Sequence, residues 1–397
     1  MDKDNLKQNL QSILTPPVQL ALILLFTFFF PVFSIPILIY RIINEKNNKL
    51  QILYLICVSL IIGYLAYHTV PAITDDLCRH YENMAVLKSI PIYKIFNASY
   101  SGVYLNTLIM YLISLTGKFG LYPALYVTIG YTFIFLMIYK FKTESKCSNR
   151  DFILITLFVF FTINCRDFIS GLRNYFTFIL CAFLIIQRYY NKISPKTCYI
   201  GIIILSLIHT SALLILILVV FNDITKDWKY RKYINGLIIF FIPIFIVCFK
   251  IFEHVLPEVA HTVFFTKVYG YFTTLNFYNM NVYIFYIGVL ILALLCHFIT
   301  KKHSTRINKG FSSFIDLYIV FVIAISPLML LLTRFMFLLV PLLGCMLCET
   351  IKNTKYQKTS RTIILFFICG GILMFLASLR AYPWRFDIPH ILFWWIR

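Results

Sequence analysis

The stretch FILITLFVFFTINCRDFISGLRNYFTFILCAFLII (152–186) decides the class of this protein, because it sets charged residues between two apolar runs. The flanking runs, 152–161 and 175–186, have the composition of membrane helices. Arg166 and Arg173 lie between them, and a guanidinium at the centre of a bilayer costs about 2.5 kcal/mol or more. On a continuous helix these two positions would share a face. The pair therefore predicts a nearby anion, from the protein or from a substrate.

The rest of the chain has the same apolar character. It is 60% hydrophobic over 397 residues, and its mean hydropathy is +0.82. These values exclude an ordinary soluble domain and predict an all-α polytopic membrane protein in which 1–397 forms a single transmembrane domain. With tilted and re-entrant segments allowed, the apolar segments predict about 11–13 transmembrane helices. They lie at roughly 18–43, 50–68, 103–117, 121–140, 151–165, 172–190, 198–221, 234–252, 282–299, 311–332, 334–348 and 362–379.

The net charge of +20 comes mostly from short basic loops, where Lys and Arg set the topology rather than bind nucleic acid. Cytoplasmic loops are predicted at 140–150, 187–196, 301–309 and 352–361. Two long polar loops, 69–102 and 253–281, are predicted to be extracytoplasmic. If every apolar segment crossed the membrane once, the basic segment 226–232 would lie on the outer side, against the positive-inside rule. The same conflict arises around 103–140. We therefore expect broken or re-entrant helices in both regions.

No metal or cofactor is predicted. The 11 cysteines are scattered through apolar segments. Cys345 and Cys348 form a C-x-x-C pair, but it lies inside an apolar run with no second pair nearby, so packing is the simpler interpretation.

An acidic pair, Asp75 and Asp76, follows the second apolar segment, with Arg79 and His80 close behind. On a helix that begins here, Asp76, Arg79 and His80 would share one face. One interpretation is a solvated helix N-cap with surface ion pairs. The other is a functional group at the mouth of a membrane site: a base, a metal ligand or a gate.

The arginine pair also has two interpretations. The arginines could extend to the interface at a helical hairpin that turns at Ser170-Gly171, with Asp167 as a neutralising neighbour. Alternatively they bind pyrophosphate, since a guanidinium presents a planar fork that matches phosphate oxygens. Arg334, in LLTRFMFLLVPLLG (331–344), is either the tip of another hairpin or a third cation that faces the phosphates.

His209, Thr210 and Ser211 lie in the middle of YIGIIILSLIHTSALLILILVVF (199–221). A histidine at the centre of a span is either packed against the backbone or functional, because this is the most expensive depth for a polar group. Its near-neutral titration suits a general base.

Taken in order, TDDLCRHYE, RDFISGLRNYFTF, HTSALL and TRFMFLLVPLLG resemble the Wzy/EpsG family of bacterial polysaccharide polymerases over about 60–345. The resemblance implies a lipid-dependent, GT-C-like glycosyltransferase of the bacterial inner membrane, with its active site facing the periplasm or exterior. It implies transfer of a growing O-antigen, capsule or exopolysaccharide chain from undecaprenyl pyrophosphate to a new lipid-linked repeat unit. Implied partners are these lipid-linked donors and acceptors, the bilayer and a chain-length regulator protein.

By motif, Arg166, Arg173 and His209 correspond to the family's arginine and histidine positions, and Asp75 or Asp76 falls at its acidic first-loop position. The expected site then has a pyrophosphate-binding group of Arg166, Arg173 and Arg334. Catalytic roles are expected for His209 and for Asp75 or Asp76, and substrate contacts for Arg79, His80 and Ser211. Asp76 and His209 are both candidates for the base that deprotonates the acceptor hydroxyl. The counter-anion of the arginine pair is then expected to be the substrate rather than Asp167.

Rival functions share part of this pattern. A polyprenyl-phosphate-dependent single-sugar glycosyltransferase would also place acidic residues outside the membrane, but it would add one sugar. A flippase or transporter for lipid-linked oligosaccharides would need no base and would show internal pseudo-symmetry. A membrane O-acyltransferase would also carry a buried histidine, but nothing in the sequence marks an acyl-donor site.

Overall fold

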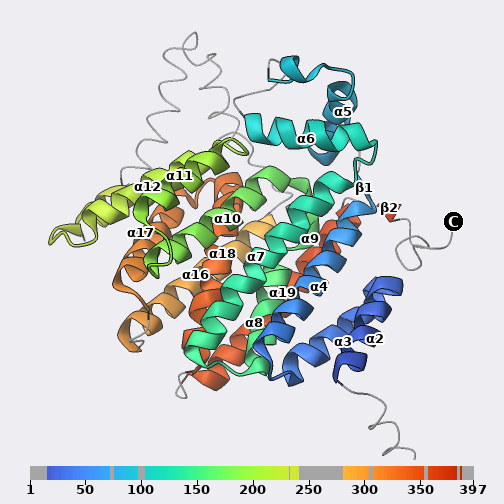
Figure 1. Ribbon diagram of the computed structural model, residues 1–397. Coiled ribbons are helices and arrows are strands. Elements are labelled where there is room, and N and C mark those ends of the chain that lie inside the picture. The colour runs from blue at the N-terminus through green and yellow to red at the C-terminus, as the bar shows by residue number, and fades with distance from the viewer. Residues whose placement is uncertain are drawn as a thin grey trace, which may run out of the picture.

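The computed structural model describes residues 16–71, 76–96, 103–231, 233–240, 280–303, 307–352, 356–381 and 385–386. This part of the chain is almost entirely helical, as the sequence predicts (Figure 1). Its helices are α2 (Pro16–Phe29), α3 (Pro31–Asn44), α4 (Asn48–Tyr67), α5 (Asp76–Leu87), η1 (Ile92–Lys94), α6 (Tyr104–Thr116), α7 (Leu121–Ser145), α8 (Asn149–Thr162), α9 (Cys165–Ser170), α10 (Leu172–Tyr189), α11 (Pro195–Ser206), α12 (Ala212–Thr225), α16 (Met280–His303), α17 (Lys309–Ile325), α18 (Met329–Lys352) and α19 (Gln357–Ala381). Within the same residues the only strands are β1 (Thr69–Val70) and β2 (Arg385–Phe386), which pair antiparallel.

Three features of the sequence prediction lie wholly or mostly outside these residues. They are Asp75, most of the apolar segment 234–252 (241–252) and almost all of the second polar loop (253–279).

Five of the described helices are long and apolar enough to cross a membrane, namely α4, α7, α16, α18 and α19. The protein is therefore a membrane-embedded all-α protein. Several other predicted spans form helices of only 12 to 14 residues, including α2, α3, α11 and α12. At 1.5 Å per residue these reach about 18–21 Å, less than the hydrocarbon thickness of about 30 Å.

Helix α18 forms the centre of the bundle and packs against α7, α8, α10 and α16. Its side chains are apolar and nearly all buried from Phe335 to Cys348. Gly344 permits a close approach of α18 to α8, since a Cβ atom there would lie 2.8 Å from Val159 Cγ2 on α8. Helix α19 lies at the periphery and exposes Leu365, Phe366, Leu373 and Leu376, as expected for a surface that faces lipid.

The predicted span 199–221 is not one helix. It breaks at 207–211, and α11 and α12 fold back on each other as a hairpin with His209 at its tip. Tyr199 Oη donates a hydrogen bond to Asp223 Oδ2 at 2.7 Å. A continuous helix would separate these two residues by about 36 Å. The single-span interpretation is therefore wrong for this segment, because hydropathy alone does not reveal a turn between two apolar helices.

The hairpin resolves the difficulty with the basic segment 226–232. Arg188 and Asp223 form an ion pair at 3.7 Å, and Arg231 Nη2 donates to Ser313 O at 2.6 Å. The basic segments before α11 and after α12 thus lie at the same end of the bundle. The broken helix expected from the charge pattern is α11–α12.

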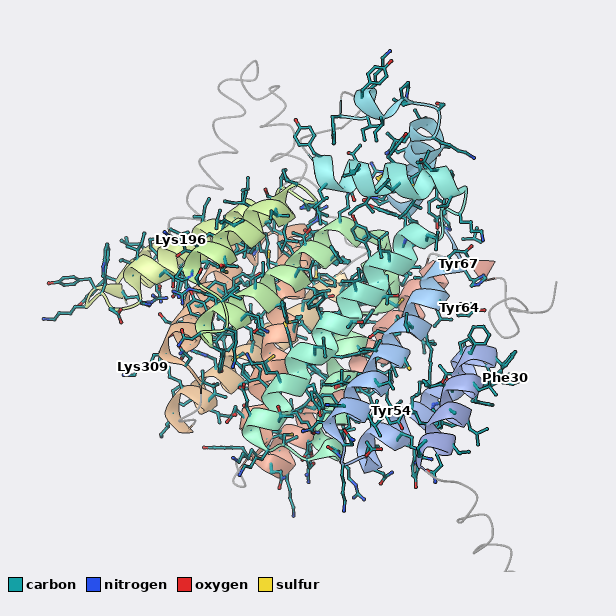
Figure 2. The ribbon with its side chains drawn as sticks, viewed as in Figure 1. Phe30, Tyr54, Tyr64, Tyr67, Lys196 and Lys309 are labelled. Atoms are coloured by element: carbon teal, nitrogen blue, oxygen red, sulfur yellow. The ribbon has the colours of Figure 1, made fainter. Side chains whose placement is uncertain are left out.

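The first apolar segment, 18–43, also folds back on itself. Helix α3 begins with Pro31 directly after Phe30, and Arg41 Nη2 donates to Gln19 Oε1 at 3.1 Å. Figure 2 labels Phe30 at this turn. The segment is a short helical hairpin that packs on α4 and α8, and not a single crossing.

We call the end of the bundle that carries the basic loops the basic end, and the opposite end the site end. At the basic end Asn149 Nδ2 donates to Ile43 O at 2.8 Å, and Arg361 Nε donates to Asp151 Oδ1 at 2.7 Å. From there α4 runs toward the site end, with Tyr54, Tyr64 and Tyr67 labelled along it in Figure 2.

At the site end α5 and α6 lie across the ends of the bundle helices (Figure 1). The backbone N–H groups of Leu105 and Asn106 both donate to Leu207 O, at 3.1 and 3.3 Å. The start of α6 therefore lies on the tip of the α11–α12 hairpin. The predicted span 103–117 is a 13-residue helix at this end, which accounts for the failed alternation near 103–140.

Candidate functional site

Helix α5 begins at Asp76, whose carboxylate lies in the first turn and complements the positive end of the helix dipole. Asp76 forms an ion pair with Arg79, and its Oδ2 lies 3.9 Å from His80 Nε2. The i, i+3 and i+4 spacing therefore brings all three together, as expected. Arg79 points outward, with 72% of its side chain exposed, whereas His80 points inward.

His80 is 5% exposed and packs edge-on against the ring of Tyr122 on α7, with centroids 5.4 Å apart. Within the described residues neither ring nitrogen makes a hydrogen bond. Burial, followed by the charge of Arg173, lowers the pKa of His80 to about 4. The imidazole is therefore neutral at pH 7.

Arg166 has a carboxylate partner in the protein. Asn164 caps α9: its Oδ1 accepts from Asp167 N–H, and its Nδ2 donates to Asp167 Oδ2, both at 2.8 Å. This fixes Asp167 so that its Oδ1 lies 3.5 Å from Arg166 Nη1. The expectation that a substrate rather than Asp167 neutralises the pair is therefore wrong for Arg166.

The two arginines do not share one helix. Gly171 ends α9, and α10 begins at Leu172. A Cβ atom at Gly171 would lie 2.9 Å from two ring atoms of Tyr175, so the close turn needs glycine. The predicted common face of Arg166 and Arg173 is thus replaced by two arginines on separate helices, on either side of the break.

Arg173 is half-buried in the first turn of α10. No hydrogen bond or ion pair joins it to any residue in the described part of the chain. Its charge nevertheless acts on His80, His209 and Tyr122. Arg173 is therefore the cation toward which α5, α7 and the hairpin tip converge.

His209 lies at the tip of the hairpin, between α11 and α12 and outside both helices. Its Nδ1 lies 2.6 Å from Ser211 Oγ, and Ser211 Oγ lies 3.2 Å from Asn174 Oδ1. The positive charges of Arg173 and Arg334 act on the His209 imidazole, and the carboxylate of Asp76 acts in the opposite sense. These side chains come from four separate segments of the chain.

Arg334 is half-buried in the second turn of α18 and is not a hairpin tip, because the turn before α18 lies at 326–328. Its charge acts on both His209 and Tyr175, and the charge of Arg166 also acts on Tyr175. Arg334 therefore lies close enough to both His209 and Tyr175 for its charge to act on each, and Tyr175 is also within reach of the charge of Arg166.

The structure thus brings one set of predicted residues together at the site end, which we call the cationic cluster: Asp76, His80, Arg173, His209, Ser211 and Arg334. Arg166 lies beside it with Asp167, and Arg79 lies at its solvent edge. The position of Asp75 lies outside the described residues. Cations outnumber carboxylates in this set, an arrangement that favours an anionic ligand.

The sequence analysis did not single out four polar residues that support the cluster, namely Asn106, Tyr122, Tyr126 and Asn174. Asn174 joins Ser211 to α10. Asn106 Oδ1 accepts from Tyr122 Oη at 2.8 Å and from Tyr126 Oη at 2.9 Å, which orients the ring against His80. A signal was available, because Asn106 is a buried amide within the apolar segment 103–117 and such a group needs hydrogen-bond partners.

Across the part of the chain that is described, no three His, Cys, Asp or Glu side chains gather so that they could hold a metal ion. Cys345 and Cys348 are buried free thiols in α18.

Fold and site define a membrane-embedded helical protein with a cationic cluster at one end of its bundle. Comparison with models of known protein families, with curated proteins and with solved structures finds no match in any of the three.

Proposed function

We propose that the protein is a polysaccharide polymerase that uses undecaprenyl-pyrophosphate-linked glycans as donor and acceptor. The observation that carries the proposal is Arg173, a half-buried cation that makes no ion pair within the described residues and lies among His80, His209 and Arg334. A site with this charge distribution suits a bound anion, and a pyrophosphate leaving group supplies one.

The charge distribution also supports an orientation. Under the positive-inside rule the basic end faces the cytoplasm, so the site end faces the periplasm or exterior. We propose the bacterial inner membrane as the location, since lipid-linked repeat units are polymerised at its outer face. The hairpin α11–α12 then enters from the cytoplasmic side and carries His209 toward the outer side.

In the proposed reaction the bond between the sugar carbon and the pyrophosphate oxygen breaks, and the acceptor oxygen forms the new glycosidic bond. Arg173 and Arg334 stabilise the negative charge that develops on the departing pyrophosphate. The acceptor hydroxyl gives its proton to a base in the cluster, for which Asp76 and His209 are the candidates. A chain-length regulator protein is a proposed partner, and the donor and acceptor lipids reach the site from the bilayer.

The experiment is a glycan gel from cells whose long-chain surface polysaccharide depends on this protein. Arg173→Ala should leave single repeat units and abolish the ladder. Arg173→Lys should restore little, because lysine keeps the charge but loses the bidentate fork. Arg150→Ala is a matched control, since Arg150 is an exposed arginine at the basic end. All variants are compared at equal membrane abundance.

A ladder of normal length in Arg173→Ala cells would refute the proposal. A product that grows by one sugar in the wild type would identify the single-sugar transferase instead. Loss of transport of the lipid-linked unit, with no effect on polymerisation of units already outside, would identify the flippase.

A further inference from the structure

The hydrogen bonds of the hairpin tip assign a protonation state to His209. We infer that His209 is held as a neutral imidazole with its proton on Nε2, and that this N–H donates a hydrogen bond to the anion bound by Arg173. His209 is then a hydrogen-bond donor in the reaction and not its base. The assignment of the proton stands on the hairpin alone, whereas the identity of the anion rests on the proposed function.

The start of α12 fixes the hydrogen-bond partners of the hairpin tip. The first N–H groups of a helix have no partner within the helix. Three N–H groups at this start donate to carbonyls of the turn: Ala212 to His209 O at 3.1 Å, Leu213 to Thr210 O at 3.0 Å and Leu214 to Ser211 O at 3.1 Å. The N–H of Ser211 has no such carbonyl partner and donates instead to His209 Nδ1, at 3.3 Å.

The backbone N–H of Ser211 determines the tautomer of His209. A backbone N–H can only donate, so the Nδ1 atom that receives it must present a lone pair. A proton on Nδ1 would set two N–H groups against each other and leave the Ser211 amide unsatisfied, which costs about 1–3 kcal/mol for a buried group. In a neutral imidazole the proton is therefore on Nε2.

The Ser211 side chain is compatible with this tautomer. Its Oγ lies 2.6 Å from His209 Nδ1 and can donate to the same lone pair. In the structure Ser211 Oγ donates to Asn174 Oδ1 at 3.2 Å. When the serine hydroxyl donates to His209 Nδ1 instead, a half-turn of the Asn174 amide lets its NH₂ group donate to the serine oxygen. Ser211 and Asn174 are thus positioning residues for the His209 ring.

The charges around His209 keep its imidazole neutral. Arg173 and Arg334 both act on the imidazole, and among the residues that the structure describes Asp76 is the carboxylate that acts against them. The positive end of the α12 dipole adds to the two arginines. Each of these effects except that of Asp76 disfavours an imidazolium ion, and burial disfavours it further. The ring is neutral, so its exchangeable proton is available as a hydrogen bond to an anion and not as a positive charge.

The consequence is a division of roles. The leaving pyrophosphate oxygen takes the electron pair of the broken bond and is stabilised by His209 Nε2–H together with the arginines. The proton of the acceptor hydroxyl goes elsewhere, and of the two candidate bases only Asp76 then remains. Within the described residues His209 Nε2 makes no hydrogen bond, so it is free to make this one.

The first test measures the proton directly. The full protein is labelled with ¹⁵N-histidine, placed in lipid bilayers and studied by NMR at pH 7. The signals of His209 are identified among the 8 histidines by their loss in His209→Gln. The inference expects an unprotonated Nδ1 and a protonated Nε2. A proton on Nδ1, or on both nitrogens, overturns it, whatever the enzymatic outcome.

The second test uses two amides of different length. In His209→Gln the side-chain NH₂ can reach the place of Nε2, whereas in His209→Asn it reaches only the place of Nδ1. Loss of one donor to a developing oxyanion lowers the rate by about 10²–10³-fold. We expect His209→Asn and His209→Ala to lose about that much chain extension, and His209→Gln to stay within about tenfold of wild type.

Equal loss in all three variants would overturn the donor role. The two proposals fail separately. If Arg173→Ala abolishes the ladder while the NMR spectrum shows a proton on Nδ1, the proposed function stands and the inference about His209 falls. If Arg173→Ala keeps the ladder, the proposed function falls and the donor role falls with it, while the spectrum still decides the tautomer.

Discussion

The hairpin α11–α12 can be tested through the buried contacts of Asp223. Its carboxylate lies 3.7 Å from Arg188 Nη2 and accepts a hydrogen bond from Tyr199 Oη at 2.7 Å. Only 15% of the Arg188 side chain and 11% of the Asp223 side chain are exposed. Among the described residues Arg188 Nε and Asp223 Oδ1 have no partner, so the pair is imperfectly satisfied.

This geometry predicts a strongly non-additive double mutant. Asp223→Leu leaves a buried guanidinium without a carboxylate and should lower the free energy of unfolding by about 3–5 kcal/mol. Arg188→Leu should cost less, about 2–3 kcal/mol, because Tyr199 still donates to the carboxylate. Replacing both residues by leucine removes both charges. The double variant should therefore lose no more free energy of unfolding than the Asp223→Leu variant alone.

The assay is equilibrium unfolding of the purified protein in mixed detergent micelles, completed as a double-mutant cycle. The expected coupling between positions 188 and 223 is at least about 2 kcal/mol. A continuous span over 199–221 would separate 223 from 188 and 199 by the thickness of the bilayer. Additive single and double variants would therefore refute the hairpin.

Three further outcomes follow from the fold and site. Gly344→Leu should overpack the contact of α18 with Val159 and destabilise the protein by about 1–3 kcal/mol, measured in the same unfolding assay. Because the pKa of His80 falls to about 4 in the folded state, the unfolded state binds more protons between about pH 4 and 6.5, so stability should decrease as the pH falls through that window. His80→Phe should flatten that part of the stability profile, and an unchanged slope would contradict the burial of His80. Arg361→Ala should destabilise the protein by about 2–4 kcal/mol, because it leaves the buried Asp151 carboxylate without its cation.

The class of fold could be predicted from the sequence, because long apolar runs leave a backbone few alternatives to helices in lipid. The α2–α3 turn also had a local signal, since Pro31 begins the second helix. The α11–α12 turn had none, because 207–211 contains neither glycine nor proline. Only the charge pattern, through the basic segment 226–232, indicated that the chain turns back.

The members of the cationic cluster could be singled out from the sequence one by one, but their arrangement could not. Polar groups in apolar runs are costly, and this identified Arg173, His209 and Arg334. Their convergence depends on how α10, α18 and the hairpin pack, and no local pattern contains that information. The ion pair of Arg166 with Asp167 illustrates the limit, since it follows from the Asn164 cap and from the helix break at Gly171.

The central claim is that Arg173 and its neighbours bind a lipid pyrophosphate. It is tested most directly by the affinity of the purified protein, in lipid nanodiscs, for undecaprenyl pyrophosphate. Arg173→Gln should weaken binding by about 10–100-fold, as expected for the loss of a charge-assisted hydrogen-bonding partner, while Arg150→Gln at the basic end should bind like the wild type. Equal affinity of the wild type and Arg173→Gln would contradict the account.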